Sequence, residues 1–383
     1  MASIPSLSET RMPYFHYQHD ELYAEKVLLS TIAARFGTPC YVYSRQAIED
    51  NWDAFDCAFQ KTSHRICYAV KANSNLAILS VLAQKQSGFD IVSQGELERV
   101  IIAGGDPEKI IFSGVGKKAE EILYALDTNI GCFNVESDAE LERLHVLATR
   151  RKKVANIALR INPNIDAKTH PHIATGLNEN KFGIELTETF SLCKKIESMS
   201  YINLIGIACH IGSQLTEIDP FLAAIDRLTE IIDPLIAAGI ALKHINIGGG
   251  LGICYQKENP PSIQDYVMAI RKKLSSYPLE IILEPGRAIV ANTGILLTRV
   301  EYLKQTSHKN FAIVDAAMND FMRPALYDAW HDIIPIRLKT DTKEKIYDIV
   351  GPVCESADFF GKNRKLALLS DSVLAICSVG AYG

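Results

Sequence analysis

The sequence predicts an α/β fold, in which a parallel (β/α)8 barrel of the TIM type is followed by a mainly antiparallel β domain. Two observations support this prediction. Between Arg65 and Arg287, eight short apolar runs alternate with longer amphipathic helical patterns. After Arg287 the runs become rich in β-branched residues, and most of them have no long helical pattern between them. Strands of a parallel sheet are covered on both faces and are therefore continuously apolar, as these runs are.

The eight apolar runs are expected to form the barrel strands in chain order. An open, doubly wound sheet is the alternative that the same alternation allows. The runs are RICYAV at 65, FDIVS at 89, KIIFSG at 109, GCFNVES at 131, NIALRINP at 156, LIGIACHIG at 204, HINIGGG at 244 and EIILEPG at 280.

Amphipathic stretches between the runs are expected to form helices, because apolar residues recur in them at three- and four-residue spacing. Several begin after Ser or Asp or end on Gly, as capped helices do. Examples are LAILSVLAQ, GELERVIIAGG, KAEEILYALD, DAELERLHVLATR, FLAAIDRLTEIIDPLIAAG and IQDYVMAIRKKL.

The remainder of the chain is expected to form the β domain. The runs ILLTRVEYL, FAIVDAA, IPIRLKT, KIYDIVG and LALLSDSVLAICSVGAYG are typical of strands. The N-terminal segment up to about residue 35 contains no barrel unit and is expected to join them. We therefore predict a barrel over residues 36–287 and a β domain formed by residues 1–35 and 288–383.

Composition favours a small-molecule partner. The chain has 383 residues, of which 48% are hydrophobic, so it can bury a large core. Its formal net charge of -5 and the absence of a long run of Lys or Arg give no electrostatic basis for binding nucleic acid or an anionic membrane.

The cysteine pattern indicates a reducing compartment. The nine cysteines are scattered and contain no C-x-x-C pair, which argues against a disulfide framework and against a zinc ribbon, so no metal site is expected. The N-terminus MASIPSLSETRMPYF lacks a cationic segment followed by an apolar one, and no apolar run is long enough to span a bilayer. We therefore expect a cytoplasmic protein.

A lysine stands at the end of the first apolar run, in ICYAVKANSN. Lysine is rarely buried without a partner, so a surface lysine at a strand end is the ordinary interpretation of Lys71. The functional interpretation is an amine at the mouth of a site, whose pKa falls on desolvation and which then attacks carbonyl carbons.

Glycines follow the seventh run at a position typical of phosphate binding. In (β/α)8 barrels the chemistry gathers at the carboxyl ends of the strands, and the loops after strands seven and eight commonly bind phosphate. Tight turns also use such glycines, but their backbone N–H groups can approach an anion closely. Gly248, Gly249 and Gly250 follow the seventh run, and Glu284, Pro285, Gly286 and Arg287 follow or end the eighth.

Other polar side chains are expected on the same rim. His210 and Ser213 follow the sixth run and Asp90 lies in the second, and each has an ordinary structural interpretation as well. Together with Lys71 they indicate pyridoxal phosphate, whose aldehyde needs a Schiff-base lysine and whose ring nitrogen needs a partner such as Glu284. A carboxylate at that position keeps the ring nitrogen protonated and makes the ring a strong electron sink.

Eight motifs in order carry a resemblance to a known family, and they cover the chain from about Phe36 to Gly383. They are YAVKANSN, FDIVSQGEL, CHIGSQ, GGGLGI, EPGR, MRPALYDAW, GPVCESADF and GAYG. In these motifs the chain closely resembles the fold-type III, alanine-racemase-like decarboxylases that depend on pyridoxal phosphate. The resemblance implies that Lys71 forms the Schiff base, that His210 lies against the ring and that Glu284 meets the ring nitrogen. The other cofactor-binding residues that it implies are Asp90, Ser213, Gly248, Gly249, Gly250, Pro285, Gly286, Arg287 and Tyr382.

The same resemblance implies a set of residues around the substrate, with Cys354 as the proton donor. From residue type alone, Arg323 would be a solvated surface charge, Tyr327 a core residue and Cys354 an inert buried thiol. A guanidinium fork is nevertheless suited to a substrate carboxylate. The implied substrate-binding residues are Arg287, Arg323, Tyr327, Glu355 and Tyr382.

The activity implied by the resemblance is decarboxylation of meso-2,6-diaminopimelate to L-lysine, the last step of lysine biosynthesis, in a homodimer with shared active sites. Decarboxylation of ornithine, arginine or carboxynorspermidine and amino-acid racemisation are the alternatives. Glu284 disfavours racemisation, which benefits from a weaker electron sink. A non-catalytic carrier of the cofactor would need only the barrel. Members of the family continue beyond GAYG, whereas the printed sequence ends at Gly383.

Overall fold

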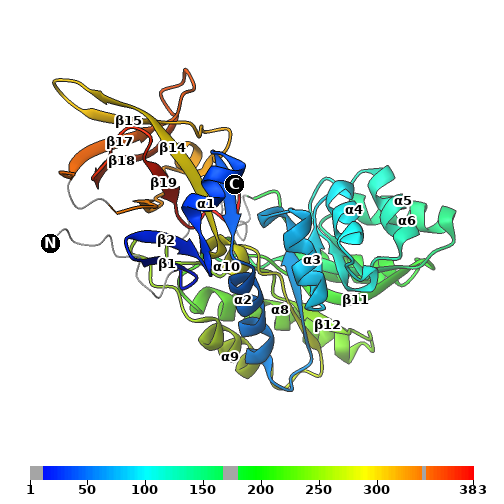
Figure 1. The fold of residues 1–383 in the computed structure, drawn as a ribbon. Helices are drawn as coiled ribbons and strands as arrows, with labels where there is room; N and C mark the ends of the chain where they lie inside the picture. The colour runs from blue at the N-terminus through cyan, green and yellow to red at the C-terminus, as the bar shows by residue number, and fades with distance from the viewer. Residues whose placement is uncertain (1–11, 167–179, 339–341) are drawn as a thin grey trace. The chain divides into compact units, whose positions relative to one another are not determined.

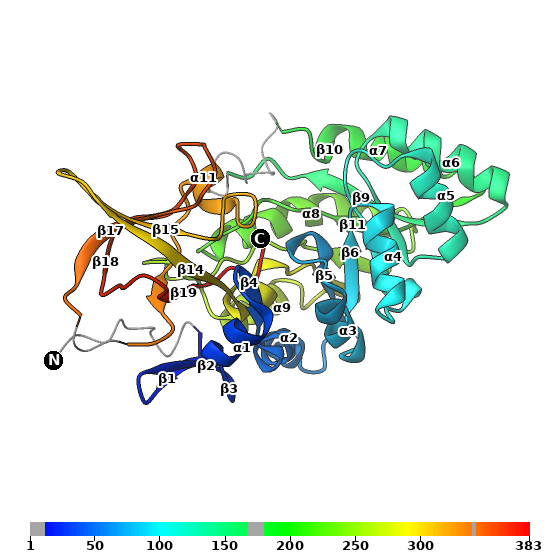
Figure 2. The same cartoon turned by 45° about the horizontal axis from the view of Figure 1, so that its top comes forward.

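The computed structural model describes residues 12–166, 180–338 and 342–383. The chain divides into two compact units, and Figure 1 and Figure 2 colour them by position along the chain. The barrel unit is formed by Glu49–Gly252 and Asn259–Ala288. The β unit is formed by Met1–Ile48, Ile253–Glu258 and Ile289–Gly383. Residues 1–11 of the N-terminal segment that we expected to join the β domain lie outside the described residues.

Parallel strands form a closed barrel in the barrel unit. The sheet runs in the order β9, β11, β12, β13, β5, β6, β7, β8, and β8 pairs back with β9. This closure confirms the predicted (β/α)8 barrel and excludes the open sheet. The strands are β5 (His64–Ala69), β6 (Gly88–Ile91), β7 (Ile110–Phe112), β8 (Cys132–Val135), β9 (Ala155–Asn162), β11 (Ile202–Ala208), β12 (His244–Asn246) and β13 (Glu280–Leu283), and β10 (Ile184–Glu185) adds a short parallel pair to β9.

Amphipathic helices cover the outside of the barrel, and Figure 2 shows α4, α5 and α6 on the outer side of the strands. Several begin with the caps that the sequence predicts: the Ser93 and Ser137 side chains accept backbone N–H groups at the starts of α4 and α6. The helices are α2 (Arg45–Phe59), α3 (Leu76–Gln84), α4 (Gln94–Ile102), α5 (Ala119–Thr128), α6 (Asp138–Arg151), α7 (Leu186–Ile196), α8 (Asp219–Ala237) and α9 (Ile263–Lys273), with α10 (Arg287–Val290) following β13.

Small and medium apolar side chains fill the middle of the barrel. They form one buried cluster of residues from β5, β7, β8, β9, β11 and β13, namely Cys67, Ile111, Cys132, Ala158, Ile205, Ala208 and Ile282. This cluster separates the two ends of the barrel, so that polar groups at the carboxyl ends of the strands form a site of their own.

The β unit contains a mainly antiparallel sheet in the order β16, β19, β14, β15, β17, β18, with β4 also pairing with β14. The pairing of β15 with β17 is its parallel exception. A second, antiparallel sheet joins β1, β2 and β3. The elements are β1 (Phe15–Gln18), β2 (Glu21–Ala24), β3 (Val27–Leu28), α1 (Leu29–Phe36), β4 (Cys40–Tyr43), β14 (Gly294–Gln305), β15 (Asn310–Val314), α11 (Arg323–Tyr327), β16 (Ile333–Pro335), β17 (Lys345–Val350), β18 (Phe359–Leu366) and β19 (Val373–Ile376).

Both faces of the long strand β14 are buried. Leu296 and Val300 belong to one apolar cluster, whereas Ile295 and Leu297 belong to another. Successive side chains of a strand point to opposite faces, so a strand covered on both sides must be apolar throughout. This is why Ile295, Leu296 and Leu297 are apolar in succession although they lie in an antiparallel sheet.

Two features of the β unit differ from the sequence analysis. Residues 36–48 and 253–258, which the sequence analysis placed in the barrel, group with the β unit, and β4 in the first of these ranges pairs with β14. The strand β18, with the sequence FFGKNRKL, is absent from the predicted runs, since its exposed Lys362 and Asn363 interrupt the apolar pattern. Within the described part of the chain, no helix has both the length and the apolar character needed to cross a membrane.

Candidate functional site

The carboxyl ends of the barrel strands surround a cavity of about 200 Å³. Its lining combines charged side chains with small and apolar ones, and β5, β6, β7, β8, β9, β11 and β13 or the loops after them contribute. The lining residues are Lys71, Asp90, Val92, Ser113, Gly114, Asn134, Arg160, Phe182, Cys209, His210 and Glu284. Four residues expected at the site, Lys71, Asp90, His210 and Glu284, are therefore brought together.

Lys71 lies at the mouth of this cavity, in the short helix η1 (Val70–Ala72) that follows β5. Its Nζ is 2.5 Å from Oδ2 of Asp90 on β6. The Asp90 side chain is completely buried, whereas the lysine side chain is 40% exposed. The other carboxylate oxygen of Asp90, Oδ1, has no hydrogen-bond partner. A buried acceptor without a donor costs free energy, so Asp90 is ready to receive one.

Glu284 follows β13 and is 8% exposed. Its Oε1 accepts hydrogen bonds from Nδ2 of Asn246 at 2.6 Å and from Nδ2 of Asn134 at 3.3 Å. Burial and, secondarily, the Asp90 carboxylate raise the pKa of Glu284 to about 7, although Lys71 acts in the opposite direction. This carboxyl group can therefore gain or lose its proton near neutral pH, and a nearby cation would favour the ionised form.

His210 follows β11, and its Nδ1 accepts the backbone N–H of Gly249 at 3.3 Å. Burial first, and then the positive charges of Arg160 and Lys71, hold the pKa of His210 well below its ordinary value. The imidazole is therefore neutral. A neutral ring can pack against another ring without bringing a further charge into the cavity.

The backbone conformation and close packing of the loop after β12 require glycine. Gly248 has φ +74 and Gly250 has φ +115, which other residues rarely adopt. A Cβ atom on Gly249 would lie 2.2 Å from the backbone oxygen of Glu284. The run is thus needed to bring the loops after β12 and β13 together, and it leaves this part of the rim without side chains.

The loops after β11 and β13 are joined by Arg287, which is 6% exposed. Its Nη2 donates to Oγ of Ser213 at 3.2 Å. The carbonyl of Pro285 accepts the backbone N–H of Ala69 on β5 at 3.1 Å, and a Cβ atom on Gly286 would lie 2.9 Å from that of Ala72. The EPGR segment therefore packs directly against the strand end that carries Lys71.

Arg160 is a cavity residue that the sequence analysis does not name. Its Nη1 donates to Oε1 of Glu136 at 2.8 Å, and both side chains are nearly buried. Asn134 and Asn246 were missed in the same way. The signal that could have identified all three is a polar residue inside an otherwise apolar strand run, as in NIALRINP, GCFNVES and HINIGGG.

The remaining predicted site residues lie in the β unit. Arg323 and Tyr327 are the first and last residues of α11. Cys354 and Glu355 are exposed on the loop between β17 and β18, so Cys354 is not the buried thiol that its residue type suggests. Tyr382 lies in the segment after β19, where its φ is +59.

Asp358 anchors the loop that carries Cys354 and Glu355. Its Oδ1 accepts the backbone N–H of Met318 and its Oδ2 accepts that of Val353, each at 2.7 Å. A buried carboxylate that accepts two backbone N–H groups fixes both segments. The exposed thiol and carboxylate therefore project from a well-anchored loop.

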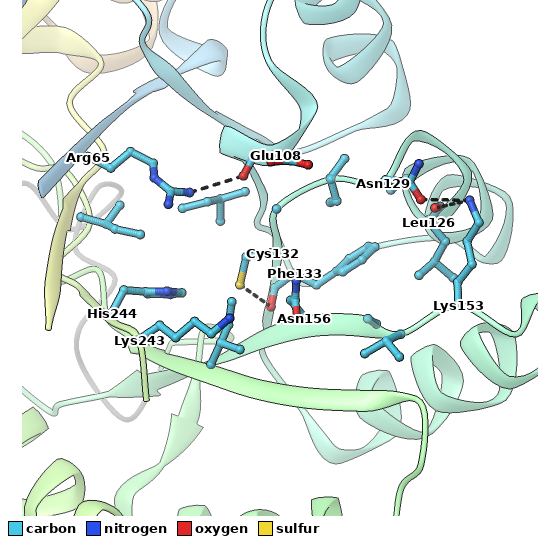
Figure 3. A pocket seen from close by; sticks show the side chains of 18 of the residues that line it. Arg65, Glu108, Leu126, Asn129, Cys132, Phe133, Lys153, Asn156, Lys243 and His244 are labelled. Carbon is cyan, nitrogen blue, oxygen red and sulfur yellow. Dashed lines mark hydrogen bonds between the residues drawn. The ribbon is translucent and has the colours of Figure 1, made fainter. Parts of the chain in front are cut away.

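A second and larger cavity, of about 460 Å³, lies at the opposite end of the barrel strands. Figure 3 shows Arg65, Lys243 and His244 directed into it. Nη2 of Arg65 pairs with Oε2 of Glu280 at 2.9 Å. Because barrels of this kind place their chemistry at the carboxyl ends of the strands, we assign the functional site to the smaller cavity.

Comparison with known proteins identifies the family. The family model described as "Pyridoxal-dependent decarboxylase, pyridoxal binding domain" matches residues 45–291. The chain is 53% identical over 372 residues to the diaminopimelate decarboxylase of Pseudomonas aeruginosa, a match that covers 97% of this chain and 89% of that protein. The chain belongs to the diaminopimelate decarboxylase family. The resemblance predicted from the sequence motifs is thereby confirmed.

Further relatives agree with this assignment. The diaminopimelate decarboxylase of Vibrio cholerae is 54% identical over 374 residues, covering 97% of this chain and 89% of the relative. The crystal structure of diaminopimelate decarboxylase from Helicobacter pylori complexed with L-lysine is 44% identical, with a TM-score of 0.89. That match covers 93% of this chain and 89% of the solved chain.

The residues around the smaller cavity fit pyridoxal phosphate, the cofactor of this family. Lys71 supplies an amine at the mouth, and Asp90 offers a buried oxygen that has no donor. Glu284 supplies a buried carboxyl group for a ring nitrogen, and His210 supplies a neutral ring. The glycine run provides a stretch of rim that a side chain would block. These groups match the aldehyde, ring and phosphate of the cofactor.

Replacing Glu284 by Gln should change how the stability of the cofactor-free protein depends on pH. Folding raises the pKa of Glu284 from 4.5 to about 7, so the folded state holds this proton more tightly than the unfolded chain. The resulting stability is present at low pH and is lost as the pH rises through this window. Denaturant unfolding at pH 5 and pH 8 should show the wild type losing roughly 2 to 3 kcal/mol more than Glu284→Gln. An equal loss in both proteins would contradict the raised pKa.

Proposed function

We propose that this protein decarboxylates meso-2,6-diaminopimelate to L-lysine and carbon dioxide with pyridoxal phosphate as its cofactor, the last step of lysine biosynthesis. The observation that carries the proposal is the cavity where Lys71, Asp90, His210 and Glu284 lie together. It occurs in a chain that is 53% identical, over 97% of its length, to a protein named diaminopimelate decarboxylase.

The barrel residues hold the cofactor in this proposal. Pyridoxal phosphate, when bound, supplies an aldehyde that captures an amine and a ring that accepts the electrons left when a bond at the substrate α-carbon breaks. Lys71 holds it through its amine, and Asp90 keeps that amine at the mouth of the cavity. Glu284 would pair with the ring nitrogen and would favour a proton there. His210, held neutral by its surroundings, would pack against the ring.

The loops after β11, β12 and β13 would hold the phosphate group. Ser213 and Arg287 contact each other across two of these loops, which keeps a hydroxyl and a guanidinium on the same part of the rim. The glycine run gives the backbone close access to the anion. The residues assigned to the phosphate end are Ser213, Gly248, Gly249, Gly250, Pro285, Gly286, Arg287 and Tyr382.

The substrate is recognised at its far end. Diaminopimelate differs from lysine and ornithine in carrying a second carboxylate beside its distal amine, so the site needs a cation for one and an anion for the other. Arg287 and Arg323 are assigned to the carboxylate and Glu355 to the ammonium group, with Tyr327 and Tyr382 beside them. Cys354 delivers a proton from its Sγ to the substrate α-carbon after carbon dioxide leaves.

A homodimer with shared active sites is part of the proposal. Cys354 and Glu355 are exposed on their loop, as a residue that reaches into a second copy of the chain must be. Large apolar side chains are exposed around them and around Arg323: Val353 is 43% exposed, Met322 53% and Leu326 55%. Clustered exposed apolar residues are typical of interfaces. The scattered cysteines favour a reducing, cytoplasmic location.

Borohydride should make the bond between lysine and cofactor permanent at Lys71. Peptide mapping of the reduced holoenzyme should find the pyridoxyl group on the peptide that contains Lys71, and Lys71→Ala should lose the label. Lys181→Ala, which removes an exposed lysine beside the cavity residue Phe182, serves as the control and should keep it. A label on Lys117 or Lys181 would show that the assignment is wrong.

Substrate choice should depend on Arg323. A charge-assisted contact contributes about 1.5 to 3 kcal/mol, so a substrate without the second carboxylate should be disfavoured by roughly tenfold to a hundredfold. We expect kcat/KM for meso-diaminopimelate far above that for lysine, ornithine or arginine, with a selective loss in Arg323→Ala. The exposed Arg337 of the same unit provides a control, Arg337→Ala, that should retain the preference. Comparable kcat/KM for ornithine and diaminopimelate in the wild type would refute the substrate assignment alone.

Mixed dimers should recover activity if two copies of the chain share each site. Lys71→Ala and Cys354→Ala are each expected to be inactive. Mixing them should restore part of the activity, because some dimers then contain one site with both residues intact. Light scattering and a labelled subunit would verify the dimer and the exchange, and exchange without recovery would count against shared sites.

A further inference from the structure

The guanidinium of Arg323 contacts a buried histidine. Nη1 of Arg323 lies 2.7 Å from Nε2 of His331, whose side chain is completely buried. Nδ1 of the same ring lies 2.8 Å from the backbone oxygen of Cys377. All three residues belong to the β unit, and no residue of the barrel unit takes part in these contacts.

The two contacts determine which ring nitrogen carries the proton. A carbonyl oxygen can only accept, so Nδ1 of His331 must donate to Cys377. A guanidinium group can only donate, so Nε2 must present its lone pair to Arg323. The imidazole is therefore neutral and serves as an oriented acceptor. A guanidinium has five N–H donors, so this contact uses only part of the capacity of Arg323.

Aromatic rings pack against both Arg323 and His331. Cζ of Arg323 lies 4.4 Å from the centre of the Tyr255 ring. The Tyr255 ring meets the His331 ring edge to face, with centroids 5.1 Å apart, and the Phe321 ring also meets it edge to face, with centroids 4.7 Å apart. A flat cation over an aromatic face keeps its plane as well as its position. The orientation of the guanidinium is thus set by an acceptor at one nitrogen and by a ring beneath it.

The backbone around His331 is anchored as well. Nη2 of Arg364, on β18, donates to the backbone oxygen of His331 at 2.9 Å. The guanidinium of Arg364 also stacks on Trp330, with Cζ 3.2 Å from the ring centre. Cys377 directly follows β19 and begins the segment that ends with Tyr382. His331 therefore ties Arg323 to a second segment that carries a residue of the proposed site.

We propose that His331 is a positioning residue that holds the guanidinium of Arg323 in the orientation in which it binds the distal carboxylate of the substrate. This inference rests on the proposed function, because it takes the role of Arg323 from there. His331 touches neither substrate nor cofactor. It acts by presenting a neutral acceptor that is fixed through the backbone oxygen of Cys377.

Two substitutions distinguish the contribution of the hydrogen-bond acceptor of His331 from the contribution of its aromatic ring. His331→Phe keeps an aromatic ring between Tyr255 and Phe321 but removes both nitrogen atoms. It should raise KM for diaminopimelate about tenfold, the lower end of what a charged hydrogen bond supports, with kcat within about twofold of the wild type. His331→Gln places an amide oxygen near the position of Nε2 and should restore KM to within about threefold of the wild type.

A double variant tests whether His331 works through Arg323. Arg323→Ala combined with His331→Phe should have the same KM as Arg323→Ala alone, because the acceptor no longer has anything to hold. Phe360→Leu controls for lost packing: Phe360 is buried in the same apolar cluster as Phe321 but has no polar contact with Arg323. It should lower the thermal midpoint and leave KM unchanged. An additive loss in the double variant, or a raised KM in Phe360→Leu, would overturn the proposal.

A crystal structure of His331→Phe would test the positioning role separately from the identity of the substrate. The guanidinium of Arg323 should move away from its place over Tyr255 or lose its single orientation. An unchanged Arg323 would overturn the positioning role even if diaminopimelate is the substrate. A displaced Arg323 in an enzyme that does not turn over diaminopimelate would support the positioning role and refute the substrate assignment.

Discussion

Two carboxyl groups, those of Asp90 and Glu284, are buried at the same end of the barrel, and their need for partners organises the site. Taking a carboxylate out of water costs several kcal/mol unless it is paired and hydrogen-bonded. Lys71 pairs with the first, and the amide of Asn246 bonds to the second. Each partner stands on a different strand or strand end. These two contacts join neighbouring strands, whereas the hydrogen bond from Asn134 on β8 to Glu284 after β13 joins strands that are not neighbours and depends on the closed ring.

The surroundings in this network raise the pKa of one group and lower the pKa of another. Burial first, and then the Asp90 carboxylate, raise the pKa of Glu284 to about 7. Burial first, and then the positive charges of Arg160 and Lys71, lower the pKa of His210 and keep its imidazole neutral. One small cavity thus contains an amine at its mouth, a carboxyl group that titrates near neutrality and an uncharged imidazole. Titratable groups whose pKa values are shifted in opposite directions by a shared environment are typical of catalytic sites.

In the β unit, neighbouring side chains likewise fix the position of a charged group, the guanidinium of Arg323. In the proposed function Arg323 binds a carboxylate of the substrate, and a long flexible side chain loses entropy when it is ordered. Contacts with His331 and with the Tyr255 ring order it in advance. His331 can do this because Cys377 and Arg364 fix its ring and its backbone. Phe321, which packs against the His331 ring, belongs to the same apolar cluster as Leu296 and Val300 of β14.

The sequence by itself determined the barrel strands, the capped helices and the residues at the strand ends, because hydrophobic periodicity and the order of the motifs are local properties. It also determined the family through Lys71, Glu284 and the other motif residues. Only the tertiary structure decided the partners. Arg160, Asn246 and His331 had no signal beyond a polar residue in or near an apolar run, and β4 joined a sheet formed by strands about 250 residues later. Pairings between distant segments depend on barrel closure and sheet order, which no local pattern contains.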